Sequence, residues 1–311
     1  MRRLNLLLRK LFFIISTLAF FLSGCATIPR NFPIIQEEEF DMLPSGGKLY
    51  LWADVDRARP ILDAISFQDM SLQAAAGILD QTRTAAAVFN SGGINQGFFM
   101  NLKGNFPTFR AGLSMAFSRA WRRQRSITGN SYWHSPLLDI GVAMGSTLAL
   151  VSMGDPFILI PLEGNQIQSP DGFNEFYRGG VIAGWINEPD ETINLFFNSL
   201  GIPLQIPADL LFFSVFPITQ SEEEHWELVF HIRTPSISQA RAVFTLFTLA
   251  RAAIIINPFE SSIERSGIQD FLPLLFANPI HREENILILR SAIMDTQELS
   301  LLFENFLVYS N

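Results

Sequence analysis

Two stretches of this sequence decide the fold: Gly97–Phe117, which reads GFFMNLKGNFPTFRAGLSMAF, and Trp226–Phe247, which reads WELVFHIRTPSISQARAVFTLF. Each begins with residues typical of a β-strand, passes a proline and continues with the spacing of a helix. Pro107 and Pro235 lie 128 residues apart, so the same strand–proline–helix pattern occurs twice. We therefore expect two units built on one plan.

Short apolar segments on either side of these stretches predict further strands. The expected strands are Leu49–Val55, Ala85–Phe89, Phe98–Lys103, Leu137–Met144, Leu148–Met153, Leu210–Phe216 and Ile286–Arg290. Asp54 or Asp56 is expected to cap a helix that runs to Ile65, and Met144-Gly145-Ser146 is expected to form a hairpin turn.

The order of these segments repeats. Gly47 precedes Trp52 by five residues and Gly180 precedes Trp185 by five, an offset of 133, while Leu148–Met153 and Ile286–Arg290 differ by 138. We predict an α+β fold, with helices on one side of the sheet, made of two similar β-α-β-β-α-β-β halves over residues 48–165 and 173–311. The halves share low identity, so a chance likeness is the alternative to an internal duplication.

Composition limits the class of protein. The 311 residues carry a net charge of −8, with 48% apolar residues, 17% charged residues and one cysteine. These values exclude a disordered chain, a collagen-like repeat and a disulfide scaffold. The acidic balance also argues against nucleic acid as a partner.

The amino terminus has the pattern of a signal peptide. Arg2, Arg3, Arg9 and Lys10 precede the apolar run Leu11–Leu22. Twelve residues span about 18 Å as a helix, which is less than the ~30 Å hydrocarbon core of a bilayer. The run therefore fits a cleaved signal better than a permanent membrane span.

Leu22-Ser23-Gly24-Cys25 follows this run and resembles the lipobox of bacterial lipoproteins. The resemblance covers residues 1–25. It implies cleavage between Gly24 and Cys25 and covalent acyl chains, palmitate among them, on Cys25. Ala26 follows, where the sorting logic of many double-membrane bacteria uses Asp for retention, so the resemblance implies an outer-membrane rather than inner-membrane location.

The expected mature chain is acidic. It has 287 residues, with 18 basic and 30 acidic side chains and a net charge of −12. Residues 25–47 hold the lipidated cysteine and three prolines, and they are expected to form a tether without regular structure. With Cys25 acylated, no thiol remains for metal binding or nucleophilic catalysis.

Motifs of known chemistry are few. The chain lacks the patterns of serine hydrolases, zinc proteases and nucleotide-binding loops, and Gly141–Thr147 lacks the lysine of a phosphate loop. His134, His225, His231 and His281 are scattered, and the pair His225 and His231 has no third ligand for a metal. We expect no catalytic residue, no metal and no cofactor besides the lipid on Cys25.

Two further segments are expected to be helices. Asn105–Arg125 is expected to be a helix with an apolar stripe that packs on the core. Its arginines, Arg119, Arg122, Arg123 and Arg125, alternatively contact anionic lipid or an acidic partner. Ser236–Ile256 is expected to be a helix buried against a sheet, or to cover a cavity for a lipid tail.

The sequence therefore favours a non-enzymatic, lipid-anchored envelope protein with a binding or structural role at the membrane. Partners would be the membrane itself, an envelope protein or a hydrophobic ligand. A carrier or sensor of a lipid is the first alternative, and an unrecognised hydrolase is the second.

Overall fold

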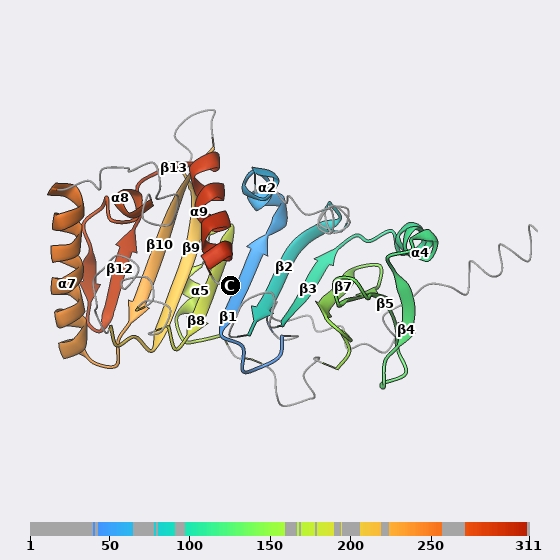
Figure 1. Ribbon diagram of the computed structural model, residues 1–311. Coiled ribbons are helices and arrows are strands. Elements are labelled where there is room, and N and C mark those ends of the chain that lie inside the picture. The colour runs from blue at the N-terminus through green and yellow to red at the C-terminus, as the bar shows by residue number, and fades with distance from the viewer. Residues whose placement is uncertain are drawn as a thin grey trace, which may run out of the picture.

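The computed structural model describes residues 40, 43–64, 78, 80–90, 97–158, 167, 169–177, 179–189, 194, 206–218, 224–256 and 271–309. The thirteen strands within these residues form one sheet, in the order β11-β12-β10-β9-β8-β1-β2-β3-β7-β6-β5-β4, with β13 paired to β10. Neighbouring strands are antiparallel. The expected α+β class is confirmed (Figure 1).

The strands are β1 (Leu49–Asp54), β2 (Thr82–Phe89), β3 (Phe98–Gly104), β4 (Arg122–Arg125), β5 (Ser131–Ser135), β6 (Ile140–Met144), β7 (Leu148–Met153), β8 (Ile182–Asn187), β9 (Leu210–Ile218), β10 (His225–Arg233), β11 (His281–Glu283), β12 (Ile286–Arg290) and β13 (Met294–Asp295). The helices are α2 (Val55–Ala64), α4 (Thr108–Phe117), α5 (Phe173–Phe176), α7 (Ile237–Ile256), α8 (Leu272–Leu275) and α9 (Thr296–Tyr309).

Most of the expected elements are present. Asp54 caps α2, because its Oδ1 accepts a hydrogen bond from the Arg57 backbone N–H at 3.1 Å. The hairpin at Gly145 is confirmed by the bond from its N–H to the Leu148 carbonyl at 2.7 Å. The strand expected from Leu137 begins only at Ile140, because residues 136–139 form a turn. The strands β4 and β5 were not expected.

The two faces of the sheet are covered differently. On β9, Leu210 and Phe212 belong to a central cluster that contains no helix longer than α5, whereas Leu211 and Val215 on the other face pack under long helices. In Figure 1, α7, α9, α2 and α4 follow one another along the sheet from the β12 end to the β4 end. The long helices therefore lie on one face, as expected.

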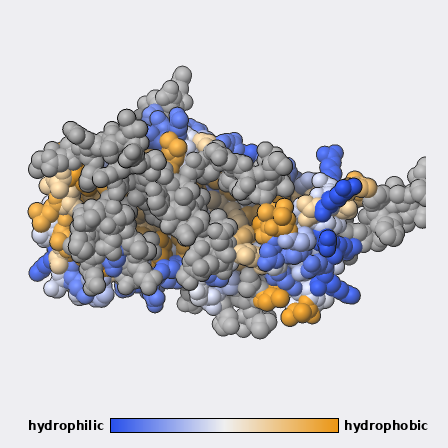
Figure 2. Space-filling view, viewed as in Figure 1, coloured by the Kyte–Doolittle hydropathy of each residue, from blue (hydrophilic) through white to orange (hydrophobic). Residues whose placement is uncertain are grey.

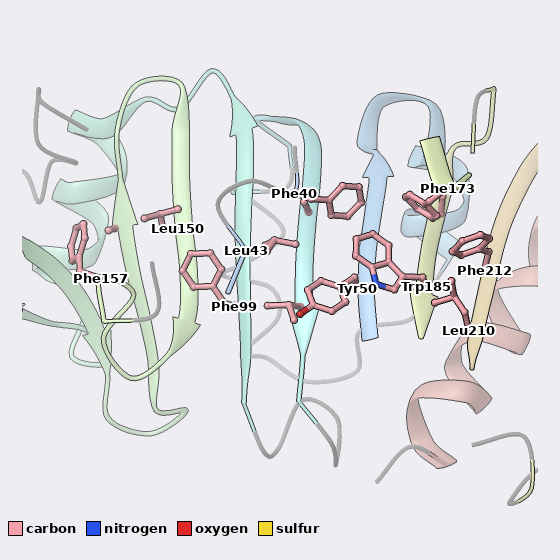
Figure 3. Close-up of a cluster of buried hydrophobic side chains, with 14 of the residues drawn as sticks. Phe40, Leu43, Tyr50, Phe99, Leu150, Phe157, Phe173, Trp185, Leu210 and Phe212 are labelled. Atoms are coloured by element: carbon pink, nitrogen blue, oxygen red, sulfur yellow. The ribbon is translucent and has the colours of Figure 1, made fainter. Parts of the chain in front are cut away.

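Aromatic rings fill the centre of the opposite face (Figure 3). Tyr50 on β1 stacks on Trp185 of β8, with ring centroids 4.7 Å apart, and Phe40 meets the same Trp185 at 4.8 Å. The Tyr50 hydroxyl accepts a bond from the Gly47 N–H and donates to the Pro44 carbonyl. Burial raises the pKa of Tyr50, and the Gly47 bond opposes that shift. This network fixes residues 43–47, the end of the expected tether, over the middle of the sheet.

Candidate membrane-contact surface

The helix α4 starts where β3 leaves the sheet. Phe106 is buried and its N–H donates to the Ser146 carbonyl at 2.9 Å, which holds the chain beside the β6–β7 turn. Ala111 and Met115 then pack against Leu102 and Val142. The helix thus rests on the sheet by a narrow strip of small and flexible side chains.

The expected helix over Asn105–Arg125 is wrong in its second half. Ser118 is extended, with φ −80° and ψ 133°, and its Oγ accepts a bond from the Ala120 N–H at 3.2 Å. Such local bonds of serine compete with helix hydrogen bonds. Residues 122–125 instead pair with β5 as the edge strand β4.

The expectation that the aromatic stripe of this helix packs on the core is also wrong in part. No side chain of α4 is buried, and the Phe109 and Phe117 side chains are 50% and 71% exposed. Ile127 and Leu137, in the turns that flank β5, are each 87% exposed. Four large apolar side chains therefore face solvent at this end of the sheet.

The arginines lie among these apolar residues. Arg119, Arg122, Arg123 and Arg125, here called the arginine edge, are all exposed. Arg122 pairs in register with His134 and Arg123 with Trp133, so their side chains leave opposite faces of β4. Arg125 donates from Nε to the Gly129 carbonyl at 2.9 Å. Arg122, Arg123 and Arg125 thus lie on an edge strand instead of a helix end, and Arg119 lies in the turn between α4 and that strand. Figure 2 shows hydrophilic and hydrophobic atoms side by side at this end.

A charge signal in the sequence marks the same region. Residues 81–138 contain no Asp or Glu and seven basic side chains, in a chain with 30 acidic residues. This segment comprises β2, β3, α4, β4 and β5. Counting charge along the chain, instead of only on the helix, would have shown that the basic character belongs to one end of the sheet.

A chain of polar side chains holds β4 to β5. The Tyr132 hydroxyl donates to Gln124 Oε1 at 2.9 Å, Gln124 Nε2 lies 3.1 Å from His134 Nδ1, and His134 Nε2 lies 2.9 Å from Asp139 Oδ1. Burial raises the pKa of Tyr132, and the carboxylates of Asp155 and Asp139 add to the rise. His134 therefore orders the hairpin that carries the arginine edge.

The other candidate residues lie elsewhere. His225 and His231 share one face of β10, and His281 lies on the edge strand β11. Within the described residues, no three His, Cys, Asp or Glu side chains are grouped as a metal site. Gly24 and Cys25 lie outside the described residues. No described helix combines the length and hydropathy of a membrane-crossing segment.

The space between α7 and the sheet is occupied. Val243, Phe247 and Ile254 of α7 pack directly on Leu211 and Leu287 of the sheet. A lipid tail would enter this region only if these side chains moved apart.

The arrangement defines the class as an α+β protein with one long antiparallel sheet and a basic, partly apolar end. Neither a known family model nor a curated protein sequence matches the chain. Solved structures of TP0453 do match. Crystal form III is 16% identical at a TM-score of 0.59, over 86% of this chain and 98% of that one. Crystal form I is 14% identical at a TM-score of 0.59, over 88% and 99%. At this identity the likeness shows the fold alone.

Proposed function

We propose that this chain is a lipid-anchored envelope protein without enzymatic activity, held at the outer membrane by acyl chains on Cys25. The support is the basic start, the short apolar run and the lipobox-like Leu22–Cys25. Two or three acyl chains anchor a protein stably, whereas one holds it only marginally. The body then acts by binding at the membrane surface.

The contact surface of the body is the arginine edge together with Phe109, Phe117, Ile127 and Leu137. The observation that carries this proposal is that four exposed apolar side chains, on α4 and in the turns that flank β5, lie at the end of the sheet that carries four exposed arginines. Anionic headgroups attract each basic residue near the surface by about 1 kcal/mol, and apolar side chains enter the boundary between headgroups and acyl chains. An anionic bilayer matches both features, whereas an acidic protein matches only the charges.

The lipid anchor is tested by labelling cells with palmitate. We expect label on the wild-type chain and none on Cys25→Ala. A free thiol at Cys25 in protein from cells would contradict the anchor.

The contact surface is tested separately on mature, unlipidated Cys25→Ser protein. We expect it to sediment with vesicles containing anionic phosphatidylglycerol, and we expect salt to release it. Arg122→Gln with Arg125→Gln removes two charges from the edge, for a loss of about tenfold or more in vesicle affinity.

Arg233→Gln with Arg282→Gln is the matched control, because it removes the same charge from residues outside both the arginine edge and α7. Equal losses for the two double variants would show that only net charge matters, and would contradict a dedicated surface. Binding to an acidic protein without binding to vesicles would assign the edge to a protein partner.

We also propose that the two halves arose by internal duplication. Outward from the centre of the sheet, β1, β2, β3, β7 and β6 follow on one side as β8, β9, β10, β12 and β11 follow on the other. In the β1–β8 ladder Leu51 pairs with Gly184, its own counterpart at the offset of 133, and Tyr50 pairs with Trp185. Such a register is expected of a twofold axis through the Leu51–Gly184 pair.

An experimental structure tests the duplication. We expect the five strands of each half to superpose at offsets of 133 for β1 on β8 and 138 for β7 on β12, with α4 falling on α7. A shift of one residue in either register would turn side chains to the opposite face and contradict it.

A further inference from the structure

The helix α7 has an apolar side against the sheet and, opposite it, an uncharged side of mostly small residues. Those on one side are buried against the sheet: Ala240, Val243, Phe247, Ala250 and Ile254. The other side, here called the outer seam, is exposed and consists of Ser238, Ala242, Thr245, Leu249 and Ala252. The Leu249 side chain is 62% exposed, although a helix that is apolar all round is normally buried all round.

The outer seam also lacks charge. Residues 237–256 contain no acidic side chain and two arginines. Arg251 donates from Nε to the Phe276 carbonyl at 3.0 Å and from Nη2 to the Ala277 carbonyl at 2.8 Å, so it is used inside the protein. The hydroxyls of Thr245 and Thr248 donate to carbonyls of their own helix. Arg241 is the exposed charge on α7.

We propose that two copies of this chain associate by antiparallel packing of their α7 outer seams. The seam repeats at alternating spacings of four and three residues, which is the pattern by which one helix lies along another. Centred near position 247, an antiparallel pair places Leu249 of each copy against Thr245 of the other. Small residues then lie opposite a large one, and the two helices approach closely.

Charge supports the antiparallel direction. Arg241 lies in the second turn of α7, so in an antiparallel pair it comes beside the last turn of the other helix. The carbonyl groups there lack helix partners and carry the negative end of the dipole, which attracts a cation. A parallel pair would instead bring the two copies of Arg241 together.

The same features disfavour a lipid surface as the partner of the outer seam. Helices that lie in a bilayer surface carry bulky residues on the inserted side and several basic residues beside them. The aromatic residues of α7, Phe244 and Phe247, pack toward the sheet, and the outer seam is made mostly of small residues. In Figure 1, α7 lies at the end of the sheet opposite α4 and β4.

The expected association is weak. A helix of 20 residues spans about 30 Å, and one helix pair buries less than the roughly 1,200 Å² of a standard interface. Confinement on a membrane raises the local concentration of the chains, so a weak pair would be populated there. The pairing itself does not depend on the lipid anchor.

Sedimentation equilibrium of mature Cys25→Ser protein tests the proposal over about 10 µM to 1 mM. We expect the mass to rise from monomer to dimer. Leu249→Glu places like charges in the seam, and we expect it to weaken association at least tenfold. Ile158→Glu adds the same charge at an exposed apolar residue outside both α7 and the proposed membrane-contact surface, and it is expected to leave association unchanged.

Disulfide trapping in the Cys25→Ser background gives a second measurement. Thr245→Cys chains mixed with Leu249→Cys chains should form disulfide-linked dimers, and Thr245→Cys mixed with Ile158→Cys should not. A monomer at every concentration without trapping, or equal association of Leu249→Glu, would overturn the proposal. Loss of binding to phosphatidylcholine vesicles in Leu249→Glu, without any dimer in the parent, would assign the seam to lipid instead.

Discussion

The helices α4 and α7 occupy matching places at opposite ends of the sheet, yet they have different surroundings. Each follows a strand and a proline, Pro107 or Pro235, and each precedes an edge of the sheet. Ten-residue α4 buries no side chain, whereas twenty-residue α7 buries a full stripe. The exposed face of α4 meets a cluster of arginines, and that of α7 is almost uncharged. One arrangement of elements thus presents two surfaces suited to different partners.

The difference follows from what lies beneath each helix. Under α7, Leu211, Leu287 and Leu289 offer a broad apolar surface that a long helix can bury. Under α4, the apolar surface is smaller and consists of Leu102, Val142, Met144 and Ala149. The polar side chains of β4 and β5 that bond among themselves lie on the opposite face, with Tyr132. The chain turns at Ser118, where the backbone is extended, and residues 122–125 then pair with β5 as a hairpin.

The largest contrast is expected from removing one phenylalanine at each end. Phe247→Ala empties a buried site and should lower the free energy of unfolding by about 3–5 kcal/mol. Phe117→Ala removes an exposed ring and should change it by less than about 0.5 kcal/mol. Urea unfolding followed by tryptophan fluorescence measures both, and equal losses would mean that α4 is packed as α7 is.

Replacing one arginine at each end of the sheet is expected to give the next largest difference in stability. Arg251→Met leaves the Phe276 and Ala277 carbonyls without their charged donor, for an expected loss of about 1.5–3 kcal/mol. Arg119→Met changes an exposed side chain and should stay within about 0.5 kcal/mol. Urea unfolding of both variants measures these changes in the free energy of unfolding. A destabilised Arg119→Met would show that the arginine edge serves the fold instead of a partner.

Substitutions at the first residues of the two helices are expected to give a smaller difference in stability. Ser236 Oγ accepts a bond from the Gln239 N–H at 3.2 Å at the start of α7, so Ser236→Ala should cost about 1 kcal/mol. Pro107 makes no side-chain hydrogen bond at the start of α4. Pro107→Ser therefore removes no helix cap and should not lower the free energy of unfolding through loss of one. Thermal unfolding measures both variants. A neutral Ser236→Ala would mean that packing alone fixes the start of α7.

A last contrast concerns pH and lies at the third strand outward from the centre on each side of the sheet, β10 and β3. His231 on β10 corresponds in sheet position to Asn101 on β3. Burial beneath Phe176, together with Arg290, lowers the pKa of His231 to about 4. The unfolded chain therefore binds a proton below about pH 6.5 that the folded chain takes up only near pH 4, and stability should fall across that interval. The drop in unfolding midpoint should shrink in His231→Gln and persist in His281→Gln.

Sequence patterns predicted the strands well where apolar runs are short and bounded by glycine or proline. They failed between Ser118 and Ser135, because the residues RRQR have no apolar alternation and their strand exists only through pairing with β5. The four arginines of the candidate surface were identifiable as a group. Their position beside Phe109, Phe117, Ile127 and Leu137 was not, since those four residues come from three separate segments.

Local chemistry in the chain determined the caps, the turns and the strand–proline–helix order, because these depend on residues close together in sequence. Asp54, Gly145 and Pro235 act in this way. The tertiary structure decided which face of each helix is left in solvent, because burial depends on what the rest of the sheet supplies beneath it. For that reason α4 and α7, similar in sequence pattern, end with one helix largely exposed and the other half buried.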